Sequence, residues 1–390
     1  MENYLKARYV WVDRLRVTAI FLVLLVHSTE PFYLGGEGSY IATQNDLFWV
    51  SLFDSLARAC VPLFIVASSY LQFPLHYNTL EFFRRRAVRV LVPFALWTVV
   101  YAIVWGEPIQ NCKDLLLNFN YAAGHLWFVY MLVGIYLIIP ILSPWAERVS
   151  KKELKIYLAI CLFTTLIPFV RWAMSGDVSV VYGPSGIPNF AKYPLWGECS
   201  WNSYGVFYYF SGFIGYILFG LYIRRFVGEL SWKKTFLFGI MPWIIGFSIC
   251  LVGFYSIVSL SATNGFPVGG PVGMAAIWET PWMYDSTGVA LMAVGWIILY
   301  KKLNKAGVAY EKLGIPLAKA SYGVYLCHML ILAFVSGWLQ ECFGLGDEGR
   351  IGIWTTPVEI LLTAVITFTV SSIICIIIGK IPKFGKYIIG

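Results

Sequence analysis

Charged side chains are scarce in this chain, and their scarcity excludes a soluble globular protein. Asp, Glu, Lys and Arg make up 13% of the 390 residues, whereas hydrophobic residues make up 59%. A soluble domain carries about 25% charged residues. We therefore predict an all-α polytopic membrane helix bundle. The net charge of +8 does not indicate binding to nucleic acid, because basic residues in a membrane protein mainly set its orientation.

Several common catalytic and metal-binding motifs are also absent from the sequence. It has no GxSxG, no HExxH and no GxxxxGK, and none of its eight cysteines belongs to a CxxC pair. We therefore expect neither a serine-hydrolase elbow nor a P-loop, and no metal site. Cys112, Cys199 and Cys342 fall in predicted outer loops, and whether two of them pair stays open.

What the chain does have is a series of long apolar segments. A helix needs about 17 residues or more to cross the hydrocarbon core. The first segment leads into STEPFY rather than into a small-residue cleavage site, so we expect it to remain as a span. We predict one integral-membrane domain over residues 1–390 with about ten transmembrane helices, at about 15–33, 47–72, 88–106, 125–143, 154–173, 204–223, 236–258, 282–300, 315–338 and 355–379.

The basic residues give this bundle an orientation. Most of the 29 lysines and arginines fall at the N-terminus, at the C-terminus or in alternate connections between the predicted spans. Cytosolic segments carry the excess of Lys and Arg. We therefore expect both termini to be cytosolic.

The first span carries two ionisable residues that are candidates for chemistry. Arg16 lies at its cytosolic end, and His27 lies about 16 Å further along the helix, near the bilayer midplane. An ionisable group at that depth costs roughly 2–3 kcal/mol unless it faces protein or water. His27 is a candidate general base, which Glu30, three residues later, could orient. The alternative is a histidine that only makes a hydrogen bond between helices.

An arginine cluster lies at the cytosolic start of the third span, in the sequence FFRRRAVRVLVP. Arg85 and Arg89 are four residues apart and share a helical face, and Arg86 lies between them. Guanidinium groups bind phosphate oxygens in bidentate fashion. The cluster is therefore a candidate phosphate site for a donor such as coenzyme A. The alternative is an anchor for lipid headgroups.

Four further residues are candidates for binding the acceptor. His125 and Trp127 lie at the outer end of the fourth span, His328 lies within the ninth, and Arg58 lies within the second, four residues after its expected partner Asp54. Plain helix contacts or an interfacial tryptophan would explain the same residues.

The outer side offers two longer loops, at about 174–203 and 259–281. They combine aromatic side chains with Gly, Pro, Ser and Asn, which suits sugar faces or a cap that rests in the interface. Glu279 and Asp285 flank the outer start of the eighth span, where either could contact a substrate or water. His76 has no assigned role.

Taken together, these segments resemble the integral-membrane acyltransferase 3 family, which includes bacterial surface-polysaccharide O-acetyltransferases. The stretches that carry the resemblance run along nearly the whole chain: DRLRVTAIFLVLLVHS, RACVPLFIVASSYL, RRRAVRVLVPF, HLWFVYMLVGIYLIIPIL, YYFSGFIGYILFG and ASYGVYLCHMLIL.

The resemblance implies a membrane O-acyltransferase in the bacterial cytoplasmic (inner) membrane. It implies acetyl-CoA, or another acyl-CoA, as the donor and a sugar hydroxyl of a glycan or lipid-linked precursor as the acceptor. Arg16 and His27 match the donor-and-catalysis pair, and Arg85 and Arg89 match the RxxxR pair. Ser69 stands where the family usually has Gly, which predicts a looser helix contact there.

Two other functions are compatible with the same features. One is an exporter of a polysaccharide or lipid-linked sugar, and the other is a non-catalytic subunit of a glycan-assembly complex. Neither needs a cytosolic site for acyl-CoA. The sequence does not indicate an oligomeric state.

Overall fold

The computed structural model describes residues 8–35, 38–75, 78–105, 109–110, 113, 121–175, 196–197, 204–271, 274–342 and 355–390. His76, Cys112, Cys199 and most of the predicted outer loop at 174–203 lie outside the described residues.

Helices make up most of the described chain, which confirms the all-α membrane bundle. The helices are α1 (Val10–Thr29), α2 (Gln44–Ala57), α3 (Cys60–Gln72), α4 (Thr79–Arg86), α5 (Val92–Val104), α7 (Trp127–Arg148), α8 (Lys151–Thr164), α9 (Ile167–Ser175), α10 (Ile214–Phe226), α11 (Trp232–Thr235), α12 (Met241–Ser261), α13 (Met274–Trp278), α14 (Thr287–Lys302), α15 (Ile315–Cys342), α16 (Thr355–Gly379) and α17 (Gly385–Ile389).

Within the described residues, eight helical stretches are long and apolar enough to cross a membrane. They are Gln44–Gln72, Thr79–Val104, Ala123–Arg148, Lys151–Val170, Trp232–Ser261, Thr280–Lys302, Tyr310–Cys342 and Thr355–Gly379. The two other predicted spans correspond to α1, whose first two turns carry several charged residues, and to α10, which has 13 residues. The count of ten therefore stays a prediction.

Three long helices begin earlier than the apolar pattern predicts, each through a wider π-helical turn. These turns are η2 (Ala87–Leu91), η5 (Phe236–Ile240) and η7 (Tyr310–Gly314). Each is followed two residues later by a proline, at Pro93, Pro242 and Pro316. Proline lacks an N–H and its ring clashes with the carbonyl four residues earlier, and a π turn is one way for a membrane helix to accommodate it.

The second predicted span is interrupted where Arg58 lies. Residues 58–59 separate α2 from α3. Pro62 follows Arg58 by four residues and has no N–H to give to the Arg58 carbonyl. The interruption brings a charged side chain into the interior of the bundle.

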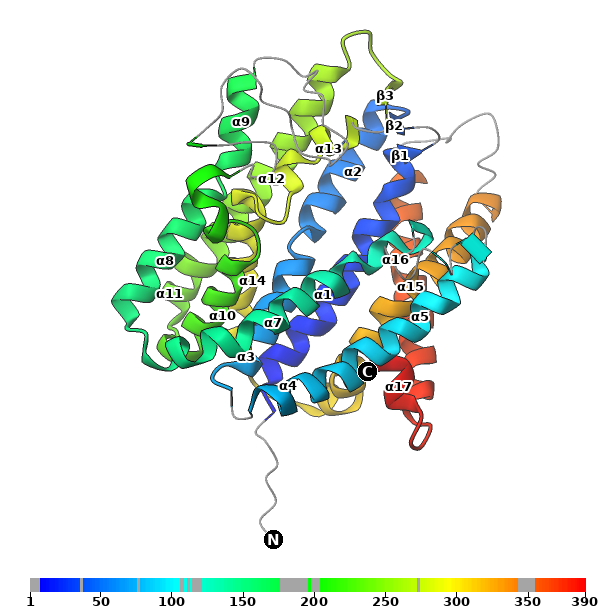
Figure 1. The fold of residues 1–390 in the computed structure, drawn as a ribbon. Coiled ribbons are helices and arrows are strands. Elements are labelled where there is room, and N and C mark those ends of the chain that lie inside the picture. Colours follow the sequence, from blue (N-terminus) through cyan, green and yellow to red (C-terminus); the bar gives the residue numbers. More distant parts are fainter. Residues whose placement is uncertain are drawn as a thin grey trace.

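Helix α1 occupies the middle of the bundle. It contacts α2, α3, α14, α15 and α16, and its Leu15, Ala19 and Leu24 are fully buried. Figure 1 shows the start of α1, α4 and α17 at one end of the bundle, and β1, β2 and β3 at the opposite end.

A small antiparallel sheet closes that opposite end. Strand β2 (Gly38–Ile41) pairs with β1 (Leu34–Gly35) on one side and with β3 (Val268–Pro271) on the other. The sequence pattern did not predict these strands. The sheet joins the connection that follows α1 to the connection that follows α12.

The contact at Ser69 is close, so the looser packing predicted from the resemblance is wrong. The Ser69 hydroxyl donates to the Ile217 carbonyl of α10 over 2.6 Å. A Cβ atom on Gly220 would lie 2.6 Å from the Ser69 Cβ. The glycine that permits close approach is therefore on α10 rather than on α3.

Candidate functional site

Three of the four histidines in the chain meet inside the bundle. His27 comes from α1, His125 from η3 (Tyr121–Leu126) and His328 from α15. The ring centroid of His328 lies 5.2 Å from that of His27 and 5.1 Å from that of His125, and the His27–His125 separation is 6.5 Å. His125 and His328 are buried. The predicted catalytic histidine and two predicted acceptor residues therefore form one cluster, called here the histidine cluster.

A carboxylate orients His27. The Nδ1 atom of His27 lies 2.9 Å from Oε1 of Glu30, at the start of η1 (Glu30–Phe32). An ionised carboxylate can only accept, so Nδ1 carries the proton of a neutral imidazole and Nε2 keeps its lone pair. The contact between these two predicted residues is therefore present, and it leaves the Nε2 lone pair available to accept a proton.

The two buried histidines present nitrogen atoms without protein partners. His328 donates from Nδ1 to the Tyr325 carbonyl over 2.7 Å. Within the part of the chain that the structure describes, Nε2 of His328 and Nε2 of His125 have no hydrogen-bond partner. Buried polar atoms are usually paired, so two such atoms at one place indicate that a ligand or water completes the site.

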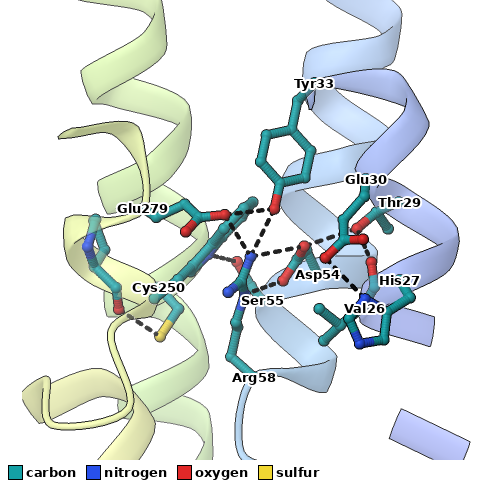
Figure 2. A network of polar contacts seen from close by, with 12 residues as sticks. Val26, His27, Thr29, Glu30, Tyr33, Asp54, Ser55, Arg58, Cys250 and Glu279 are labelled. Atoms are coloured by element: carbon teal, nitrogen blue, oxygen red, sulfur yellow. Dashed lines mark hydrogen bonds and ion pairs between the residues drawn. The ribbon is translucent and has the colours of Figure 1, made fainter. Parts of the chain in front are cut away.

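Arg58 lies at the centre of a charged network beside this cluster (Figure 2). Its guanidinium donates to Asp54, to the Tyr33 hydroxyl over 2.9 Å and to Glu279 over 3.1 Å. The Tyr33 hydroxyl donates to Glu279 over 2.6 Å. Thr29, two residues after His27, donates to Asp54 over 2.7 Å. This confirms the predicted Asp54–Arg58 pair.

A cavity of about 310 Å³ lies beside the network. Its lining includes Arg58, Glu279 and Asp285, together with an aromatic wall that consists of Trp127, Phe213 and Tyr284. The Trp127 ring lies nearly parallel to those of Tyr284 and Phe213, with centroids 5.6 and 6.2 Å apart. The structure thus brings two predicted acceptor residues, Arg58 and Trp127, to one cavity.

Arg16 belongs to α1 and its side chain contacts α15, on the cytosolic side of the cluster in the predicted orientation. It donates to the Ser321 hydroxyl over 3.0 Å. Ser321 is seven residues before His328 on α15, and Arg16 is eleven residues before His27 on α1. The two helices therefore run in the same direction, from the Arg16–Ser321 contact to the His27–His328 contact.

The predicted phosphate-binding arginines lie apart from the cluster, at the α4 end of the bundle. Arg85 is exposed and pairs with Glu81 over 2.7 Å, and Arg89 is exposed. Arg86 packs over the Phe82 and Tyr136 rings. Its Nε atom is buried and has no hydrogen-bond partner among the described residues.

Sequence reasoning missed several residues of the site. Tyr33 and Tyr284 belong to no sequence motif. Each lies at the outer end of a predicted span, where an aromatic residue usually marks the membrane interface and so does not indicate a site. Glu279 was noted only for its position. Its hydrogen bond to Arg58 of the distant second span depends on the fold.

Across the residues that the structure describes, no group of three or more His, Cys, Asp or Glu side chains is arranged to hold a metal ion.

Comparison with known proteins identifies a family for this chain. The model of a family described as an acyltransferase domain matches residues 9–376. No curated protein and no solved structure matches the chain.

Proposed function

Because the chain belongs to the acyltransferase family whose model spans residues 9–376, we propose that it transfers an acetyl group from cytosolic acetyl-CoA to a sugar hydroxyl. The acceptor is a cell-surface glycan or its lipid-linked precursor, and the setting is the bacterial cytoplasmic membrane. The observation that carries the proposal is the Glu30-oriented His27, which meets two buried histidines next to a charged and aromatic cavity.

The arginines at the α4 end supply the donor site in this proposal. Arg85 and Arg89 are exposed there, and the buried Arg86 Nε lacks a partner within the described chain. Phosphate oxygens would satisfy such donors with charge-assisted hydrogen bonds. The pantetheine arm of the donor then runs between α1 and α15, past Arg16 and Ser321, toward His27.

His27 performs the proton transfer. Its Nε2 atom takes the proton from the sugar hydroxyl while Glu30 stabilises the imidazolium that forms. The sugar oxygen attacks the thioester carbonyl carbon, a C–O bond forms, the C–S bond breaks, and the thiolate of coenzyme A leaves and takes up the proton. A positioned general base contributes about 10²–10⁴-fold to the rate.

Acetyl-CoA binding to the purified protein tests this function against the exporter and subunit functions. Wild-type protein in detergent should bind acetyl-CoA, and the double variant Arg85→Gln/Arg89→Gln should bind it about tenfold or more weakly, since each charged hydrogen bond contributes about 1.5–3 kcal/mol. Arg148→Gln, at an exposed arginine in the last turn of α7, is the matched control. Absence of binding to the wild-type protein would contradict the proposal.

A further inference from the structure

We infer that the cavity beside Arg58 binds a neutral sugar ring of the acceptor and disfavours a sugar that carries a carboxylate, such as a uronic acid. The inference rests on the proposed function, because it names the chemical class of the acceptor. It is drawn from the charge, the aromatic wall and the size of the cavity.

The charge of the lining is negative overall. Glu279 and Asp285 contribute two carboxylates, and Arg58 contributes one guanidinium. That guanidinium is shared, because it donates to both Glu279 and Asp54. A carboxylate on the ligand would therefore meet a surplus of like charge, which costs affinity.

The same carboxylates suit a ligand rich in hydroxyl groups. Glu279 accepts from Tyr33, and Asp285 accepts from Tyr204. An ionised carboxylate has about four lone-pair sites, so each one can accept further hydrogen bonds. Sugar hydroxyls are such donors, and they bring no charge.

The aromatic wall supplies the apolar part of the contact. Trp127, Phe213 and Tyr284 line the cavity together, and their rings contact one another. The C–H face of a pyranose ring can pack on such a surface while its hydroxyls reach the carboxylates. Binding sites of this kind combine apolar walls with a few polar groups that fix the orientation of the ligand.

The size of the cavity suits one sugar ring, and two of its lining residues lead toward the histidine cluster. A volume of about 310 Å³ lies at the low end of small-molecule sites, which suits a single sugar ring rather than a long oligomer. Trp127 is two residues after His125, and Arg58 reaches Tyr33, three residues after Glu30. Two lining residues are therefore linked to the histidine cluster, Trp127 through its neighbour His125 in the chain and Arg58 through its hydrogen bond to Tyr33.

A matched pair of glycosides tests the inference directly. Methyl glucoside and methyl glucuronide differ only at C6, where the first has a hydroxymethyl group and the second a carboxylate. Saturation-transfer difference NMR on the full-length protein in detergent should give a signal about tenfold or more stronger for the glucoside. Glu279→Gln removes one negative charge and should raise the glucuronide signal relative to wild type.

Two tryptophan variants locate the binding. Trp127→Ala should reduce the glucoside signal to background, whereas Trp338→Ala, at an exposed position on α15, should leave it unchanged. A glucuronide signal equal to or above that of the glucoside would overturn the inference, as would the absence of both signals. Acetyl-CoA binding by the same sample separates this result from the proposed function: a sample that binds acetyl-CoA but prefers the glucuronide refutes only the acceptor class.

Discussion

At the scale of single residues, the hydrogen-bond partners of His27 and His328 distinguish the chemistry of these two histidines. His27 faces a carboxylate, whereas His328 faces a backbone carbonyl. A carboxylate stabilises the positive charge that an imidazole acquires when it takes a proton, and it does so more strongly than a carbonyl. This difference supports the proposal that His27 is the base of the cluster.

Replacing Glu30 tests this orientation. Glu30→Leu removes the acceptor for His27 Nδ1 and should lower the turnover number for acyl transfer by about a hundredfold. Glu30→Gln keeps an acceptor oxygen but loses the charge, so its rate should fall between those of wild type and Glu30→Leu. Glu147→Gln, at an exposed position near the end of α7, controls for the loss of a carboxylate elsewhere. A wild-type rate in Glu30→Leu would remove Glu30 from the mechanism.

Arg58 has a structural role that can be measured without substrate. Arg58→Met leaves the carboxylates of Asp54 and Glu279 facing each other without their shared cation. Breaking a buried ion pair from one side costs about 3–5 kcal/mol, so the unfolding temperature in detergent should fall clearly.

The double variant Asp54→Asn/Arg58→Met serves as the comparison for that single change. It also removes one of the two negative charges that face each other, so it should recover part of the stability lost in Arg58→Met. Arg84→Met, at an exposed arginine of α4, should leave the unfolding temperature near that of wild type. Equal unfolding temperatures for Arg58→Met and wild type would show that the pair does not stabilise the bundle.

The residue contacts that sequence reasoning predicted are local ones. Arg58 follows Asp54 by four residues, and Glu30 follows His27 by three. Either spacing places the two residues of a pair on one helical face. The meeting of His27 with His125 and His328 depends on how α1, η3 and α15 pack. No spacing rule connects residues so far apart, which is why the sequence left them as separate candidates.

At the scale of the elements, glycine determines how closely α12 and α14 approach. A Cβ atom on Gly246 would lie 2.4 Å from the Gly288 carbonyl oxygen, and one on Gly295 would lie 2.7 Å from the Gly239 carbonyl oxygen. Small residues at such contacts let membrane helices pack backbone to backbone.

Gly246→Ala should therefore destabilise the protein by about 1–3 kcal/mol, the usual cost of overpacking. Thermal unfolding in detergent would measure it. Gly134→Ala is the control, because its added Cβ would meet nothing within 4 Å on α7. Equal unfolding temperatures for the two variants would contradict the close contact that the structure shows.

Sequence patterns identified the long helices well but placed several ends wrongly. The apolar runs at 88–106 and 315–338 predict helices that start near those residues. The corresponding helical stretches begin at Thr79 and Tyr310 instead. The polar helix α4 and the π turn η2 precede the first apolar run, and the π turn η7 precedes the second. Hydropathy detects apolar residues, and it does not register a helix that continues into a polar segment.

At the scale of the whole molecule, the predicted orientation would place the two proposed substrate sites on opposite sides of the membrane. The start of α1, α4 and α17 lie at one end of the bundle, which would be cytosolic, and the strands lie at the other (Figure 1). An acyl donor confined to the cytosol and an acceptor on the outer side would then meet at the histidine cluster.

Cysteine labelling tests this orientation. Cys342, at the exposed end of α15, should react with a membrane-impermeant maleimide on intact cells when Cys112 and Cys199 are replaced by Ser. Lys305→Cys, in a variant that also lacks Cys342, should react only after the membrane is opened, since position 305 is exposed on the cytosolic side in this orientation. The reverse labelling pattern would show the opposite membrane orientation, with the arginines of α4 on the outer side, and would contradict the proposed donor site.

The most direct measurement of the central claim uses inside-out membrane vesicles with matched amounts of wild-type protein or His27→Ala. Radiolabelled acetyl-CoA is added, and label is counted in the glycan and lipid-linked sugar fractions. We predict label with the wild-type protein and a loss of about a hundredfold or more with His27→Ala. Equal label with both proteins would contradict the assignment of His27 as the base, and absence of label with both would contradict acetyl transfer from cytosolic acetyl-CoA.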